Sequence, residues 1–141
     1  GIFYEQGRGG VELNYTEAVS WYRKAAEQGY ADAQYQLGYL HFAGLGVEAN
    51  STEAAKWFRK AAEQGVPDAQ FQTGVYLVRG EGVEQDMVEG YKWLSIANGN
   101  NHQGAKDVLK ELQISKRFHT KAISEGQMRA NEFFGRQEQK R

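Results

Sequence analysis

Apolar positions between residues 50 and 65 recur every three or four residues, which is the period of an amphipathic α-helix. The helix that they predict begins after Asn50, an N-cap candidate with Glu53 three residues further on, and ends before Gly65. Its apolar face consists of Ala54, Trp57, Phe58, Ala61 and Ala62. The face is broad, so the helix needs a packing partner.

The same pattern is repeated along the chain at a fixed interval. An interval of 36 residues separates Trp21 from Trp57 and Trp57 from Trp93, and segments 21–29 and 57–65 are nearly identical. The matching N-cap candidates are Asn14, Asn50 and Asp86, and the glycines expected to end the helices are Gly29, Gly65 and Gly99. Repetition at this period is typical of solenoids, in which each copy buries its open face against the next.

A further helix is expected before each of these helices. It covers about residues 31–42, and its second copy begins at Pro67, because proline at the first helical position loses no hydrogen bond. Its packing face carries Ala33, Leu37, Leu40 and His41. A link of about seven residues, which contains Gly80 and Gly82 in its second copy, joins the two helices. A link this short predicts antiparallel packing within each pair.

The periodic pattern fades after residue 102, and residues 115 to about 137 predict one long helix. Phe118, Ala122, Met128 and Phe133 are its apolar positions. A solenoid needs an end unit that is apolar inside and polar outside, and this helix suits that role. We therefore assign residues 1–112 to repeats and 113–141 to a capping helix and tail. The repeats divide into a partial first copy at 1–30, copies at 31–66 and 67–102, and a degenerate copy from 103. Because the pattern starts within a repeat, we expect a longer repeat protein to precede it.

At these residues the sequence resembles the Sel-1-like repeat family, bacterial members of the tetratricopeptide-repeat superfamily. The matching positions are Leu37, Gly38, Gly44, Gly46, Val47, Asn50, Ala54, Trp57, Ala61, Ala62 and Gly65. His41 and Leu77 depart from the tyrosine that the family prefers. The resemblance implies an all-α, right-handed superhelix of 36-residue helix-turn-helix repeats. It also favours a periplasmic or secreted location over a cytoplasmic one.

Composition and charge exclude several classes of partner. Lys and Arg number 17 against 18 Asp and Glu, so the chain lacks the excess of basic residues that nucleic-acid binding requires. No apolar run approaches the roughly 20 residues that a membrane-spanning helix needs. We therefore expect neither a nucleic-acid partner nor membrane insertion. The chain contains no cysteine, which excludes disulfides and thiolate chemistry.

Few residues suggest catalysis or metal binding. The three tryptophans each have an alanine four residues further on, so we expect them in the core rather than stacked on a ligand. His41, His102 and His119 lack a second ligand at metal-site spacing. The glycine link at 80–82 lacks the third glycine and the Lys-Ser/Thr pair of phosphate loops. We predict no catalytic, cofactor or metal site.

One side of the first helix in each pair is a candidate binding surface. It carries Asp32, Tyr35, Tyr39 and Phe42, and the equivalent positions one repeat later are Asp68, Phe71, Val75 and Val78. Tyr35, Tyr39 and Phe42 are neighbours by helical geometry, and related tetratricopeptide arrays bind peptides on the matching concave surface. The alternative is that these aromatic residues pack between adjacent repeats.

The sequence therefore predicts a non-enzymatic scaffold, monomeric by itself, that binds a peptide or protein segment on its concave face. Two alternatives stay open. The first is a hydrolase or a protein of the bacterial envelope that binds a cell-wall ligand, for which no nucleophile and base can be paired in the sequence. The second is a purely structural module that spaces or dimerises a larger protein.

Overall fold

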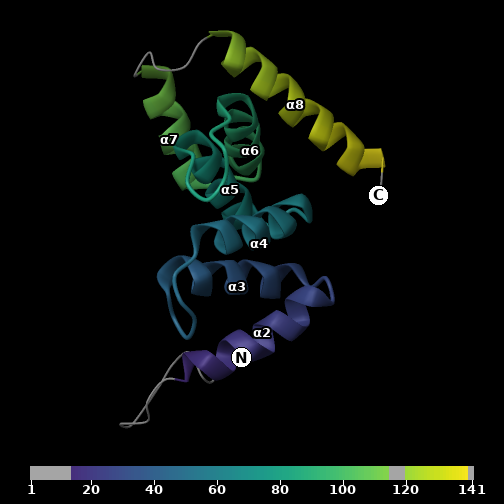
Figure 1. The fold of residues 1–141 in the computed structure, drawn as a ribbon. Helices are drawn as coiled ribbons and strands as arrows, with labels where there is room; N and C mark the ends of the chain where they lie inside the picture. Colours follow the sequence, from purple (N-terminus) through teal and green to yellow (C-terminus); the bar gives the residue numbers. More distant parts are fainter. Residues whose placement is uncertain (1–13, 115–119, 140–141) are drawn as a thin grey trace.

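The computed structural model describes residues 14–114 and 120–139, and these residues form α-helices without a β-strand (Figure 1). The helices are α2 (Tyr15–Glu27), α3 (Ala31–Ala43), α4 (Ser51–Glu63), α5 (Pro67–Arg79), α6 (Met87–Gly99), α7 (Gln103–Ile114) and α8 (Thr120–Gln139). Successive helices stack on one another along the chain, so the protein is an all-α helical solenoid. Residues 1–13, which hold the beginning of the partial first copy at 1–30, lie outside the described residues.

The predicted N-caps are confirmed. The side chains of Asn14, Asn50 and Asp86 each accept the N–H of the residue three positions on, at 2.9, 3.1 and 3.0 Å. These bonds satisfy N–H groups that have no partner within the helix, and they set the starting points of α2, α4 and α6.

The predicted C-terminal glycines are confirmed in two copies and wrong in the third. Gly29 and Gly65 follow α2 and α4 with φ angles of +97° and +98°. Gly99, in contrast, is the last residue of α6, and Asn101 takes the left-handed conformation with φ +66°. Asn101 stands 36 residues after Gly65, so α6 keeps the repeat length. Asparagine tolerates this backbone conformation, which explains how the period survives without a glycine.

Helices α3 and α4 pack closely, as do α5 and α6, because a glycine faces a large side chain in each pair. A Cβ atom on Gly38 would lie 2.9 Å from the Phe58 ring, and one on Gly74 would lie 2.7 Å from Leu94. The glycines therefore leave room for apolar side chains that are themselves completely buried. This explains their recurrence at a 36-residue interval.

The apolar face predicted for α4 is buried in full. Its Trp57 is 3% exposed and packs with Val19 of α2 and with Leu37 and Leu40 of α3. The second helix of one pair is thus covered by the pair before it, which is how stacking closes the open face of each repeat.

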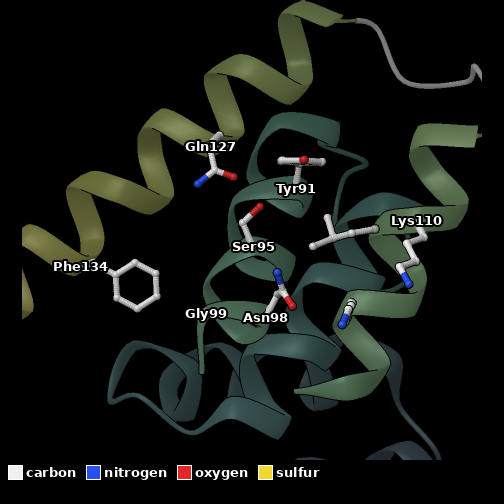
Figure 2. Close-up of a pocket in the computed structure, with 9 residues that line it drawn as sticks. Tyr91, Ser95, Asn98, Gly99, Lys110, Gln127 and Phe134 are labelled. Atoms are coloured by element: carbon white, nitrogen blue, oxygen red, sulfur yellow. The ribbon is translucent and has the colours of Figure 1, made fainter. Parts of the chain in front are cut away.

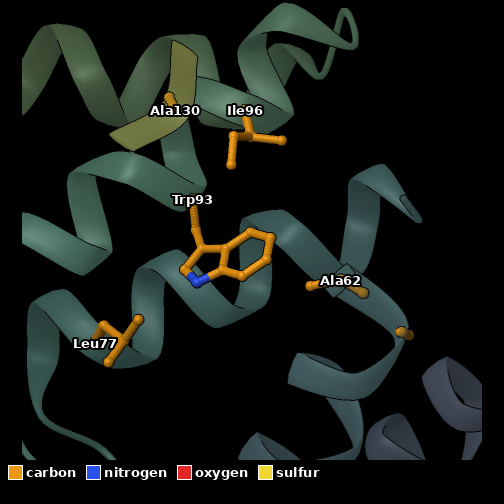
Figure 3. Close-up of a cluster of buried hydrophobic side chains, with 7 residues drawn as sticks. Ala62, Leu77, Trp93, Ile96 and Ala130 are labelled. Carbon is orange, nitrogen blue, oxygen red and sulfur yellow. The ribbon is translucent and has the colours of Figure 1, made fainter. Parts of the chain in front are cut away.

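Trp93 repeats this arrangement, and Trp21 does not. Trp93 is 2% exposed and lies among Ala62, Leu77 and Ala130 (Figure 3). Trp21 is 54% exposed, so the prediction that all three tryptophans are buried is wrong for this one. Each buried tryptophan packs against the preceding helix pair, and the described residues include no pair before α2.

The predicted capping helix is present as α8, which lies along α6 and diverges from α7 (Figure 1). The helices approach closely at Gly126, where an added Cβ atom would lie 2.8 Å from the Cβ atom of Tyr91. Ala130 is fully buried, and the Phe133 ring meets the Trp93 ring edge-on at a centroid distance of 5.6 Å. Small residues therefore allow α8 to cover the outer side of α6.

An ion pair also holds α8 to α6. The Arg129 guanidinium lies 2.7 Å from Glu89, a residue in the first turn of α6. Among the four apolar positions predicted for the cap, Phe133 is half-buried but Met128 is 61% exposed, because it lies on the side of α8 away from α6. Phe118 and the side chain of Ala122 lie outside the described residues.

Removal of residues 115–141 is expected to make the chain associate, because it uncovers the apolar side chains of α6 beneath α8. Ala130→Glu should act in the same direction without shortening the chain, since it places a carboxylate in a fully buried site. Light scattering after size-exclusion chromatography would detect the association. Met128→Ser, on the exposed side of α8, is the matched control. Truncated protein that stays monomeric with an unchanged melting temperature would contradict the capping role.

Candidate interaction surface

The α3 half of the predicted surface is largely exposed. Tyr39 is 43% exposed and Phe42 is 49% exposed, and their ring centroids are 6.2 Å apart. Asp32, one turn before Tyr35, is also exposed, whereas Tyr35 is half-buried. We call Tyr35, Tyr39 and Phe42 the aromatic stripe. Two of its three rings lie on the surface of a well-packed helix.

The aromatic stripe continues into the core through ring contacts. Tyr35 lies 5.5 Å from Phe58 between ring centroids, and Phe42 lies 6.4 Å from Tyr76. Phe58 and Tyr76 are both buried and meet each other edge-on at 5.8 Å. Packing between adjacent repeats, the alternative to a binding surface, therefore applies to some residues of the aromatic stripe and not to others. Tyr35 packs partly between repeats, while Tyr39 and Phe42 are exposed.

The α5 half of the predicted surface is less accessible. Phe71 is half-buried and stacks on the His102 ring at a centroid distance of 4.6 Å and an interplanar angle of 16°. Val75 and Val78 are also half-buried, against a cluster formed by α6 and α7. Asp68 remains exposed, with 63% of its side-chain surface accessible. The structure thus turns the apolar members of this half towards the next repeat.

The structure gives His102 a role that was not predicted from the sequence. Its Nδ1 accepts the N–H of Ala105 at 3.1 Å, so the proton of the neutral ring is on Nε2, which lies 2.8 Å from the Asp68 carboxylate. The ring therefore caps α7 and ties its start to α5. Position 102 is equivalent to Tyr30 and Val66, neither of which makes a side-chain cap. The sequence does contain a signal for this role, because a histidine stands at a position where the other two repeats have tyrosine or valine.

Two phenols of this region, those of Tyr35 and Tyr76, have raised pKa values. Burial, followed by the nearby charges of Asp68 and Tyr39, raises the pKa of Tyr35. Burial and the charge of Glu81 raise the pKa of Tyr76 to about 12. Asp68 of the α5 half therefore acts electrostatically on Tyr35 of the α3 half of the predicted surface. Formal charge on that surface comes from the carboxylates of Asp32 and Asp68.

Other chemistry finds little support among the described residues. No three His, Asp or Glu side chains gather there in a way that could hold a metal ion. In the same part of the chain, no helix has both the length and the apolar character to cross a membrane.

Comparison with known proteins extends this picture. The Sel1 repeat model matches residues 1–30, 31–66 and 67–102. A protective antigen present in uropathogenic Escherichia coli strains, whose crystal structure displays an SLR fold, is 31% identical with a TM-score of 0.82. The alignment covers 95% of this chain and 28% of that one. No curated protein matches the chain at a significant level.

A second solved structure is the Sel1 repeat protein from Oxalobacter formigenes, which is 39% identical with a TM-score of 0.66. That alignment covers 72% of this chain and 41% of the other. This chain therefore spans less than half the length of either solved chain. The three matched repeats, the 36-residue helix pairs and both structural relatives lead to one conclusion: the chain belongs to the Sel1 repeat family.

Proposed function

We propose that this chain is a non-enzymatic scaffold that binds a peptide or protein segment along the aromatic stripe, on the concave face of the solenoid. Sel1 repeats generally mediate protein–protein interactions. The observation that carries the proposal is the exposure of Tyr39 and Phe42 beside each other on a rigid helix. Exposed aromatic pairs of this kind are typical of interface centres.

The surroundings of the stripe indicate the chemistry of its partner. The Tyr39 and Phe42 rings offer an apolar contact whose inner edge is held by the buried Tyr76. The exposed carboxylate of Asp32 lies at the start of the same helix. A segment that combines an apolar side chain with a basic one matches this surface. Asp68 contributes less, because its carboxylate already accepts a hydrogen bond from His102.

Tyr39→Ala is expected to weaken partner binding while leaving the fold intact. Truncation of a central aromatic residue commonly costs about 2 kcal/mol of binding free energy, which corresponds to roughly 30-fold in affinity. The loss of folding stability should stay below about 1 kcal/mol, since the ring is 43% exposed. Peptides selected from a displayed library against the wild-type chain, then titrated against both proteins, would measure the change in affinity.

Tyr30→Ala is the matched control, because Tyr30 is 64% exposed at the N-cap of α3 and is not part of the stripe. It should leave affinity unchanged. Phe71→Ala should lower stability first, because the variant loses the stacking contact with His102. Equal affinity of the wild-type and Tyr39→Ala proteins would move the binding site away from α3. If the chain is instead a structural spacer or dimerisation module, the affinity of the selected peptides should not depend on Tyr39.

A further inference from the structure

A cleft opens between α7 and α8 (Figure 2). These two helices lie on the side of the solenoid away from α2 (Figure 1). The floor of the cleft is α6, and its volume is about 410 Å³. The lining residues are Tyr91, Ser95, Asn98, Gly99, Lys106, Leu109, Lys110, Gln127 and Phe134. This volume falls within the range of small-ligand sites. The cleft shares no residue with the aromatic stripe.

Ser95 provides a buried polar group on the floor of the cleft. The residue is only 8% exposed, and its hydroxyl has no hydrogen-bond partner in the described residues. Figure 2 shows the hydroxyl on the side of Ser95 that faces Tyr91 and Gln127. A buried hydroxyl without a partner costs folding free energy. Its persistence at the base of a cleft is accounted for if a ligand supplies the missing hydrogen bond.

Two lysines give one wall of the cleft a positive charge. Lys106 and Lys110 are one turn apart on α7, where like charges destabilise a helix. Neither ammonium lies within 4.0 Å of a carboxylate in the part of the chain that the structure describes. An anion between the two lysines would relieve their repulsion. The charge of the wall therefore favours a negatively charged ligand.

The remaining walls limit which anion fits. Leu109 of α7 and Phe134 of α8 provide apolar surface on the two sides, and Asn98 adds an exposed amide from α6. The amide of Gln127 donates to Asn131, which leaves its carbonyl oxygen as an acceptor. A bare inorganic anion would leave the apolar walls uncovered. A molecule with a carboxylate, an amide and an apolar group could contact the lysines, the polar side chains and the apolar side chains of the cleft.

We propose that this cleft binds a carboxylate attached to an apolar group, as in the C-terminal residue of a peptide. The lysines pair with the carboxylate, the apolar side chain rests between Leu109 and Phe134, and Ser95 and Gln127 bond the peptide amide. A free organic acid offers the same carboxylate and apolar body without the amide.

Titration of the ¹⁵N-labelled full chain with N-acetyl-Ala-Leu and N-acetyl-Ala-Phe, followed by NMR, tests the proposal. The free acids are expected to shift backbone amides of residues 91–110 with dissociation constants below about 10 mM. The same dipeptides with an amidated C-terminus should bind at least about tenfold more weakly, since they lose the charge-assisted bonds. Octanoate and inorganic phosphate serve as further probes.

Variants separate the contributions of the walls. Lys106→Gln with Lys110→Gln should reduce the affinity for the free acids at least about tenfold. The control, Lys24→Gln with Lys60→Gln, removes the same charge from α2 and α4 and should not change the affinity. Ser95→Ala should weaken dipeptide binding severalfold without lowering the melting temperature, because the hydroxyl makes no bond within the described residues.

The outcomes are distinct. Octanoate binding as tightly as the dipeptides would support the carboxylate site and identify a free acid as its ligand. Absence of shifts in residues 91–110 with both free acids would overturn the proposal. So would equal binding of acids and amides, or of dipeptides and phosphate. Tyr39→Ala should bind the dipeptides normally, so failure here is distinguishable from failure of the proposed scaffold function.

Discussion

Replacing Trp57 with alanine is expected to destabilise the solenoid by about 3–5 kcal/mol, the usual cost of emptying a buried tryptophan site. The indole packs against helices α2 and α3, so its loss loosens two repeats at once. Its N–H is buried and has no hydrogen-bond partner among the described residues, so no hydrogen bond is lost with the ring. Urea denaturation followed by far-UV circular dichroism would measure the change in unfolding free energy.

Trp21→Ala provides the matched control, because Trp21 occupies the same repeat position on α2 but is 54% exposed. Its replacement should cost less than about 1 kcal/mol. The two variants differ only in whether a preceding helix pair covers the ring. Equal losses in both, or a loss below about 1 kcal/mol for Trp57, would mean that stacking between repeats does not depend on this residue.

Gly82→Ala is expected to cost about 2–5 kcal/mol, by a different mechanism. Gly82 has φ +66°, and a Cβ atom there would lie 2.3 Å from the carbonyl oxygen of Ser51. The left-handed conformation costs roughly 1–2 kcal/mol for a residue with a side chain. Overpacking against rigid backbone adds about 1–3 kcal/mol. The collision is with α4 of the preceding pair, so the turn must move away from its neighbour.

Gly65→Ala separates the two contributions. Gly65 has φ +98°, and a Cβ atom there would meet no atom of the described residues within 4 Å. Only the backbone term applies, so the loss should be about 1–2 kcal/mol. Melting curves and denaturant titrations of both variants give the difference. If Gly82→Ala costs no more than Gly65→Ala, the turn does not set the spacing between repeats.

Local chemistry explains why the sequence predicted the helices so closely. Asn50 accepts a bond from a residue three positions away, and Pro67 needs only its own ring to begin α5. Both effects act within one turn of helix, so no knowledge of distant residues is needed. Gly99 was wrongly predicted to be the left-handed residue after α6 because it is a glycine. The 36-residue period instead places that residue at Asn101.

The links between repeats could not be derived in the same way. Gln34 is buried, donates to the carbonyl of Ala26 in the preceding repeat and accepts from Gln64 at the end of its own repeat. One repeat later, Gln70 donates to Ala62 and accepts from Asn100. These amides repeat visibly in the sequence. Their role depends on partners about 30 residues away, which only stacking brings within reach.

The sequence by itself determined the helices, their caps, the antiparallel pairs and the face that each pair buries, because all of these follow from spacing within one repeat. Only the tertiary structure decided which equivalent residues differ in burial. It exposed Trp21, stacked Phe71 on His102 and left Tyr39 open, and it created the cleft between α7 and α8. The physical reason is that burial of a side chain depends on what the neighbouring repeat places over it. A period of 36 residues repeats positions, but the residues that cover each position differ from one described repeat to the next.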